Sequence, residues 1–249
     1  MRHLMTVLAV ALFTTLSFST AQALTLTAAK DAYVQSGTNS NNNYGSSLQD
    51  FIKRQDGSVY NRVSYIGFDL SGLPDLAVAE ATLSLNFVES TATDATDADI
   101  VYEFEVFGLI DESLDNWGEN TITWVTAPGL APTTTQTFSS TLLASLGTFS
   151  LTGKGLGAFD FTSQAFVDFL NSDTNDIATL VLARTTNQQE STSTSSNNYI
   201  HAIASKENTA VAGPTLTVTQ LTPVPEPSTL LLLAAGLVGI GLIGRRKKN

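Results

Sequence analysis

The sequence predicts an all-β fold, an antiparallel sandwich crossed by one short helix, and two observations favour it. Apolar and polar residues alternate along many short runs, which is the pattern of strands with one buried and one exposed face. Clusters of Gly, Asn, Asp and Ser separate these runs, and such clusters form turns. Many short strands at this spacing are typical of sandwiches, and the lack of a repeat of fixed period argues against solenoids and propellers.

The expected strands follow one another along most of the chain. Alternation is strictest over residues 63–68, 81–87 and 101–107, and each of these runs has one apolar face. Shorter runs predict further strands at residues 148–151, 158–161, 179–183, 199–204 and 215–219. The first half of the chain therefore carries the longest predicted strands.

A single crossover helix is predicted over residues 163–170. Ser163 is a typical N-cap residue, and helical spacing groups four apolar residues on one face, namely Ala165, Phe166, Phe169 and Leu170. Polar stretches without periodicity are expected to be loops, at residues 36–47, 133–140 and 185–198.

The start of the chain has the features of a signal peptide over residues 1–23. Arg2 and His3 precede an apolar run over residues 4–18, and Ala21 and Ala23 supply the small residues that signal peptidase requires. We therefore expect export and a mature chain that begins at Leu24. The chain contains no cysteine, which excludes disulfides, thiol nucleophiles and thiolate metal sites.

The end of the chain predicts a transmembrane helix with a basic end over residues 228–249, after a linker over residues 220–227. The uncharged run over residues 228–244 would reach about 25 Å as a helix, just short of a hydrocarbon core of about 30 Å. Four cations follow, Arg245, Arg246, Lys247 and Lys248. Because such cations stay on the cytoplasmic side, everything before the run is expected to lie outside.

The linker contains the run Val224-Pro225-Glu226-Pro227-Ser228-Thr229. With the apolar segment and the basic end, this run resembles the PEP-CTERM sorting signals of Gram-negative biofilm formers. The resemblance implies processing by exosortase, a membrane transpeptidase, after transient anchoring in the inner membrane, and then delivery to the cell surface or the extracellular matrix. An ordinary C-terminal anchor is the alternative, but it leaves the Pro-Glu-Pro run unexplained.

The chain is acidic, with 12 Lys and Arg residues against 23 Asp and Glu residues and a formal net charge of −11. Loss of the signal peptide and the basic end would make it more acidic still. A surface of this charge repels nucleic acid, so no nucleic-acid partner is expected.

Blocks of sequence spread over residues 28–219 share a second pattern. The most specific block is Phe68-Asp69-Leu70-Ser71-Gly72-Leu73-Pro74. The others are residues 31–34, 43–46, 61–67, 79–83, 117–128, 159–162, 205–207 and 214–216. In this order they resemble the DNRLRE (disaggregatase-related) domain. The resemblance implies a jelly-roll β-sandwich that acts as a non-catalytic carbohydrate-binding module, with acidic polysaccharide such as alginate among its ligands.

Sugar recognition needs aromatic faces for pyranose rings and planar polar groups for hydroxyls or carboxylates. The strongest candidates are Tyr44, Lys53, Arg54 and Arg62, followed by Tyr33, Trp117 and Lys206. Arginine can bind a uronate carboxylate with two hydrogen bonds. Lys53, Arg54 and Arg62 lie within ten residues of one another and could equally be solvated cations at a strand edge. Arg62 could also pair internally with Asp69 or Glu207. Trp124 is expected in the core.

Catalysis has little support in the sequence. Without the signal peptide the chain has one histidine, His201, and alternation places it on the same face as Tyr199 and Ile203. A structural role is therefore predicted, and no catalytic residue is assigned. A polysaccharide lyase remains a third possibility, after a carbohydrate-binding protein and a structural, glycosylated surface protein.

Metal binding is expected at one residue at most. Two acidic stretches offer hard oxygen ligands, but both lack the glycine and glutamate of an EF-hand loop, so they are predicted to be solvated loops. They are Asp94, Asp97 and Asp99, and Asp173, Asn175 and Asp176. A jelly roll can hold a structural Ca²⁺ where its first and last strands meet, and Asp31 is the candidate ligand there.

Overall fold

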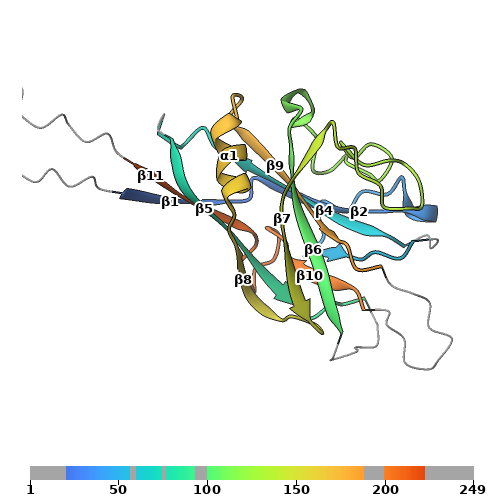
Figure 1. Cartoon of the computed structure of the whole chain (residues 1–249). Helices are drawn as coiled ribbons and strands as arrows, with labels where there is room; N and C mark the ends of the chain where they lie inside the picture. The colour runs from blue at the N-terminus through green and yellow to red at the C-terminus, as the bar shows by residue number, and fades with distance from the viewer. Residues whose placement is uncertain (1–20, 57–59, 75–76, 93–99, 188–198, 222–249) are drawn as a thin grey trace, which may run out of the picture. The chain divides into compact units, whose positions relative to one another are not determined.

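A computed structural model describes residues 21–56, 60–74, 77–92, 100–187 and 199–221, and residues 22–220 form one compact unit. Two antiparallel sheets pack as a sandwich (Figure 1). The six-stranded sheet contains β1 (Ala21–Thr27), β3 (Gln49–Ile52), β5 (Val78–Val88), β8 (Gly157–Phe161), β10 (His201–Ala204) and β11 (Thr215–Leu221). The five-stranded sheet contains β2 (Lys30–Gln35), β4 (Arg62–Asp69), β6 (Val101–Leu109), β7 (Leu143–Thr152) and β9 (Ile177–Arg184).

The path of the chain is that of the predicted jelly roll. From β2 to β6 each strand lies in the sheet opposite its predecessor, and β7, β8 and β9 again cross between the sheets. The strand order is β1-β11-β5-β10-β3 in one sheet, where β8 also pairs with β5, and β2-β4-β9-β6-β7 in the other. The predicted all-β antiparallel sandwich is therefore confirmed. The edge strands β2 and β3 place their side chains close together at one side of the sandwich.

The predicted helix is present as α1 (Gln164–Ser172), which connects β8 to β9 and contacts β5 and β7. The Ser163 hydroxyl accepts a hydrogen bond of 3.0 Å from the Phe166 amide, as expected of an N-cap. Phe166, Val167, Phe169 and Leu170 are buried. Ala165, expected on this face, is exposed, because the buried stripe is centred one residue further along the chain.

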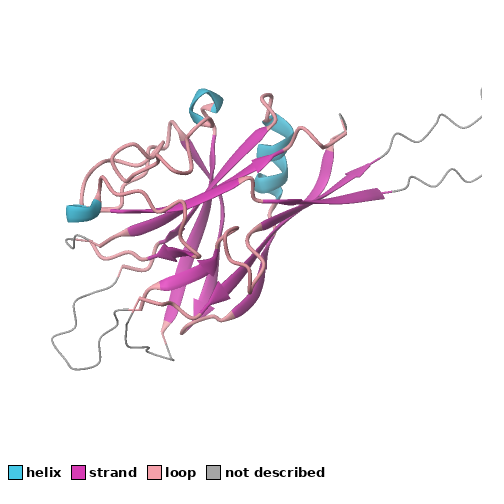
Figure 2. Cartoon of the chain, turned by 180° about the vertical axis from the view of Figure 1, so that it is seen from behind, coloured by secondary structure: helices cyan, strands magenta, loops and turns pink. Residues whose placement is uncertain are grey.

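Two hydrophobic cores lie on opposite faces of the five-stranded sheet. The larger core fills the sandwich and includes Ile66 and Phe68 of β4. In the second core, Trp117 and Trp124 of the long connection at residues 110–142 pack with Val63 and Tyr65 of β4. Figure 2 shows this connection as loops beside the strands. β4 is consequently buried on both faces, and the sequence prediction of one apolar face for this strand is wrong.

Several sequence predictions fall on residues outside the described part of the chain. These are most of the signal peptide, the sorting motif at Pro225, Glu226 and Pro227, the membrane segment with its four cations, and the stretch with Asp94, Asp97 and Asp99. Ala21 and Ala23 are described and begin β1. No helix in the described ranges has the length and apolar character needed to cross a membrane.

Candidate functional site

The candidate site begins with the side chains of β2, an edge strand of the five-stranded sheet. Successive side chains of a strand point to opposite faces. Ala32 and Val34 enter the second core, so Asp31, Tyr33 and Gln35 point the other way. The register pairs Tyr33 with Ser64 and Gln35 with Arg62. The inner face of this edge therefore carries a row of polar and aromatic residues.

Three aromatic rings meet at the middle of this row. Tyr33 and Tyr44 stack with ring centroids 4.3 Å apart and planes inclined by 15°. Phe51 of β3 meets Tyr33 edge-on at 5.0 Å. Tyr33 is buried, whereas Tyr44 and Phe51 are half-buried. Tyr33 thus supports Tyr44 from one side, and Tyr44 is the tyrosine of the pair that reaches the surface.

The loop that carries Tyr44 is fixed by contacts to the 110–142 connection. The side-chain Nδ2 of Asn43 donates hydrogen bonds to the backbone carbonyls of Glu119 at 2.7 Å and Ile122 at 2.8 Å. A Cβ at Gly45 would lie 2.1 Å from the Glu119 carbonyl oxygen, so only glycine fits this close approach. These contacts hold the Tyr44 ring in one position.

The predicted cations occupy different environments near these rings. The Arg62 guanidinium lies 5.5 Å from the centroid of Phe51, and its Nε donates a hydrogen bond of 2.9 Å to Gln35. Lys53 is buried and forms a backbone bridge with Arg62. Arg54 is half-buried and pairs with Asp56 at 2.8 Å. Arg62 therefore stands closest to the aromatic group.

The structure answers one of the alternatives for Arg62. Asp69 ends the strand that Arg62 begins, which separates the two residues by roughly 23 Å at about 3.3 Å per residue. An ion pair between them is excluded by this distance. Gln35 and Phe51 are the partners of Arg62 that the sequence did not indicate.

Trp117 does not lie where a sugar platform requires. Its side chain is buried, its indole nitrogen donates a hydrogen bond of 3.0 Å to Thr179, and the Lys30 ammonium lies 4.3 Å from its ring centroid. This burial gives no support to the predicted sugar-binding role of Trp117, because the 110–142 connection folds the residue onto the sheet. Trp124 is in the second core, as expected.

An acidic cluster lies at the other end of the β2 row. The Asp31 amide donates a hydrogen bond of 2.8 Å to the Glu119 carboxylate, and the Lys206 amide donates one of 2.7 Å to Asp31 Oδ2. Burial raises the pKa of Asp31 to about 7, the Lys206 amide opposes this shift, and the nearby charge of Glu207 adds to it. Lys206, predicted to bind sugar, thus joins the acidic cluster, with its Nζ 3.1 Å from Glu119.

Asp50 lies behind this cluster in the interior. It is fully buried and accepts a hydrogen bond of 2.7 Å from the Ser64 hydroxyl. Burial raises the pKa of Asp50 well above its ordinary value, and the charge of Asp31 raises it further. The polar residues of β2, β3 and β4 therefore meet inside the sandwich, where sequence patterning alone predicts apolar ones.

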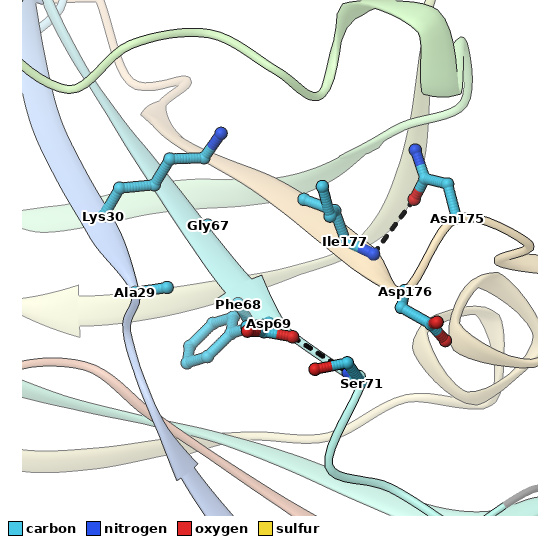
Figure 3. Close-up of a pocket in the computed structure, with 9 residues that line it drawn as sticks. All are labelled: Ala29, Lys30, Gly67, Phe68, Asp69, Ser71, Asn175, Asp176 and Ile177. Atoms are coloured by element: carbon cyan, nitrogen blue, oxygen red, sulfur yellow. Dashed lines mark hydrogen bonds between the residues drawn. The ribbon is translucent and has the colours of Figure 1, made fainter.

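A hollow of about 360 Å³ lies beside the ends of β4 and β9 (Figure 3). It is lined by Ala29, Lys30, Gly67, Phe68, Asp69, Ser71, Asn175, Asp176 and Ile177. The Lys30 ammonium donates hydrogen bonds to the carbonyls of Asp115 and Trp117, and Phe68 is fully buried. The hollow thus offers carboxylates without an exposed aromatic ring, and it suits an acidic polysaccharide poorly.

The loop with Asp173, Asn175 and Asp176 forms a turn held by its own hydrogen bonds. Asp173 Oδ1 accepts a hydrogen bond of 2.8 Å from the Asp176 backbone amide, and Asn175 Oδ1 accepts one of 2.9 Å from the Ile177 backbone amide. These two hydrogen bonds fix the backbone of the turn, and the solvated loop stays a prediction.

His201 lies in the interior of the sandwich, with no exposed surface. Its Nε2 contacts the Gly153 carbonyl at 3.0 Å, and its Nδ1 lies 3.5 Å from the Arg184 guanidinium. Burial lowers the pKa of His201 to about 3, and the charge of Arg184 lowers it further. The imidazole is therefore neutral and held in the core.

A jelly-roll sandwich with a fixed aromatic pair and an arginine at its edge has the architecture of a carbohydrate-binding module. The chain belongs to carbohydrate-binding module family 96, whose family model matches residues 22–152. The PEP-CTERM protein-sorting motif matches residues 223–248. No curated protein matches the chain significantly.

These two matches support the general functions that the sequence resemblances implied, but not their finer details. The family indicates carbohydrate binding by a non-catalytic module, and the sorting motif indicates export and exosortase processing at the membrane. The matched segment ends at Thr152, the last residue of β7, so β8 to β11 complete both sheets beyond it. The finer likeness to the DNRLRE domain stays a prediction.

Proposed function

We propose that this chain is a non-catalytic matrix or cell-surface protein of a Gram-negative biofilm or envelope, and that it binds acidic polysaccharide through the edge formed by β2, β3 and β4. The observation that supports this proposal most is the stacked pair of Tyr33 and Tyr44 beside Arg62. Family membership supplies the class of ligand, and the pair with Arg62 supplies a place for it.

The aromatic pair favours binding because it needs little rearrangement. Tyr33 covers one face of Tyr44, and the Asn43 hydrogen bonds hold the loop. A sugar ring that packs on Tyr44 gains apolar contact without first ordering the ring. Preorganisation of this kind is what a shallow sugar site requires to reach useful affinity.

Arg62 adds selectivity for a carboxylate. Gln35 and Phe51 orient its guanidinium, and the planar fork of a guanidinium suits a uronate through charge-assisted hydrogen bonds. The formal charge of −11 makes most of the surface repel polyanions. An acidic polymer would therefore bind at this local cation and not across the surface.

The route to the surface follows from the two terminal signals. Signal peptidase would cut after Ala23, and the tail would hold the chain in the inner membrane until exosortase acts at Pro225, Glu226 and Pro227. The mass of the exported protein tests this route. A product that starts at Leu24 and ends within or before the motif supports it, and a full-length product contradicts it.

Affinity electrophoresis of the full chain in gels with alginate, pectin or xylan tests the binding function. Retardation by an acidic polymer supports the proposal, and equal migration in all gels favours a structural surface protein. A lyase would also release unsaturated products that absorb in the ultraviolet. Retardation without such absorbance is the expected result.

A further inference from the structure

Three carboxylates from distant parts of the chain meet near the β2 edge. Asp31 belongs to β2, Glu119 to the 110–142 connection, and Glu207 to the connection between β10 and β11. One carboxylate oxygen of each lies within 4.8 Å of those of the other two. We name this group the Asp31 cluster. Its members are close enough to share one ligand.

The cluster contains buried oxygens that the described residues do not satisfy. Asp31 is 1% exposed, and no hydrogen-bond donor of the described chain reaches its Oδ1. Glu207 Oε2 is likewise buried, and no hydrogen-bond donor of the described chain reaches it. Buried carboxylate oxygens are costly unless a donor or a cation meets them. The neighbours of Asp31 Oδ1 in the cluster are other carboxylates, which cannot donate when ionised.

The charge of the cluster is incompletely balanced. Lys206 contacts Glu119 at 3.1 Å and also contacts Glu207, so one ammonium faces three carboxylates. With all three carboxylates ionised, as they would be around a bound cation, two negative charges remain, which is the charge that a divalent cation neutralises. Glu119 and Glu207 keep side-chain exposures of 17% and 23%. Water and ions can therefore reach the cluster from that side.

We propose that Asp31, Glu119 and Glu207 bind a divalent cation, and that Ca²⁺ is the ion their carboxylate oxygens fit. Asp31 Oδ1 and Glu207 Oε2 supply the unsatisfied ligand atoms, and Glu119 supplies a third. Water completes the coordination on the exposed side. The ion ties β2, the 110–142 connection and the connection between β10 and β11 together, so it stabilises the fold where these segments meet.

The site also bears on sugar binding, a consequence that rests on the proposed function. The Glu119 carbonyl accepts the Asn43 hydrogen bond and lies against Gly45, next to Tyr44. A cation that holds Glu119 in place thus holds the loop of the aromatic pair. Removal of the ion is expected to weaken polysaccharide binding as well as stability.

Calorimetric titration of CaCl₂ into the chelator-treated full chain tests the site without any sugar. Wild type is expected to bind one Ca²⁺. Glu207→Gln keeps the size of the half-exposed side chain and is expected to weaken binding by about tenfold or more, or about 1.4 kcal/mol. Glu80→Gln is the matched control, because Glu80 is exposed on β5 and lies outside the cluster.

The melting temperature supplies a second readout. Ca²⁺ is expected to raise it in wild type and Glu80→Gln, and much less in Glu207→Gln. The proposal is overturned if wild type gives neither a heat of Ca²⁺ binding nor a higher melting temperature with Ca²⁺. Equal Ca²⁺ binding by wild type and Glu207→Gln would overturn it as well. Ca²⁺ binding by a chain that no polysaccharide retards supports the cation site and contradicts the proposed function, so the two failures are distinguishable.

Discussion

Tyr44 stacks on Tyr33 with ring centroids 4.3 Å apart, although the two residues belong to different segments of the chain. Tyr33 lies on β2, whereas Tyr44 lies in the loop before β3. The buried ring thus acts as the support of the half-exposed one. This contact places an aromatic surface beside Arg62, whose guanidinium lies 5.5 Å from the centroid of the Phe51 ring.

Replacement of Tyr44 is expected to weaken polysaccharide binding with little effect on folding. Tyr44→Ala removes the ring that meets the sugar, and we expect a loss of roughly tenfold in affinity, the scale of one aromatic contact. Tyr44→Phe keeps the ring and is the control. Equal affinity of the alanine variant and wild type, measured by gel retardation, would contradict the role of Tyr44.

Replacement of Arg62 is expected to change selectivity. Arg62→Gln removes the cation and should weaken binding to alginate or pectin more than to neutral xylan. Arg62→Lys keeps the charge but loses the planar fork, so it should restore only part of the affinity. The ratio of retardation in acidic and neutral gels measures the effect, and an unchanged ratio in Arg62→Gln would rule out a carboxylate contact.

Gly45 provides a test of the loop that carries Tyr44. In Gly45→Ala the new Cβ would lie 2.1 Å from the Glu119 carbonyl oxygen, so the loop must shift at a cost of roughly 1–3 kcal/mol. We expect a lower melting temperature and weaker polysaccharide binding. Gly72→Ala is the matched control, because a Cβ at that position would have no atom within 4 Å. Similar behaviour of the two variants would argue against a fixed loop.

His201 predicts a dependence of stability on acid. Its folded pKa is lowered to about 3 by burial and by Arg184, whereas the unfolded value is about 6.5. The neutral imidazole therefore stabilises the fold above pH 6.5, and this stability is lost as the pH falls from 6.5 toward 3. The charged, titratable and polar groups that face the ring are Arg184 from β9, Tyr102 from β6, Tyr199 and the Gly153 carbonyl. The apolar rings of Phe87 and Phe104 also contact it.

Urea unfolding at pH 7 and pH 4 measures this effect. Between pH 7 and pH 4, His201 is expected to lower the free energy of unfolding by an amount on the order of 3 kcal/mol. His201→Gln cannot take up the proton and is expected to lose less stability between the two pH values than wild type does. An equal loss in both proteins would show that other groups govern the acid response.

Local patterning predicts the eight strands β4 to β11, but not β1 or the edge strands β2 and β3, which carry much of the site. β5 and β6 alternate clearly in sequence, and both form as expected. β2 escapes prediction as a strand because Asp31 and Gln35 are polar and yet buried, so its pattern does not alternate. Local patterning also does not predict the second core, because residues 110–142 have no regular apolar pattern and fold onto the sheet through Trp117 and Trp124.

The candidate site is predictable in its residue types and not in its contacts. The need of sugars for rings and cations points to Tyr44 and Arg62, whereas Phe51 and Gln35 join them only through the pairing of strands. Asp31 is predicted as a ligand, but Glu119 is 88 residues away in sequence. Such distances are closed by the jelly-roll path, which local sequence patterns do not encode.

Binding of acidic polysaccharide at the β2 edge can be measured by calorimetric titration of a soluble alginate or pectin fragment into the full chain. We expect saturable binding by wild type that falls at least about tenfold in the Tyr44→Ala, Arg62→Gln double variant. Saturable binding that is equally strong in the double variant, or no binding of any acidic polymer by wild type, would contradict it.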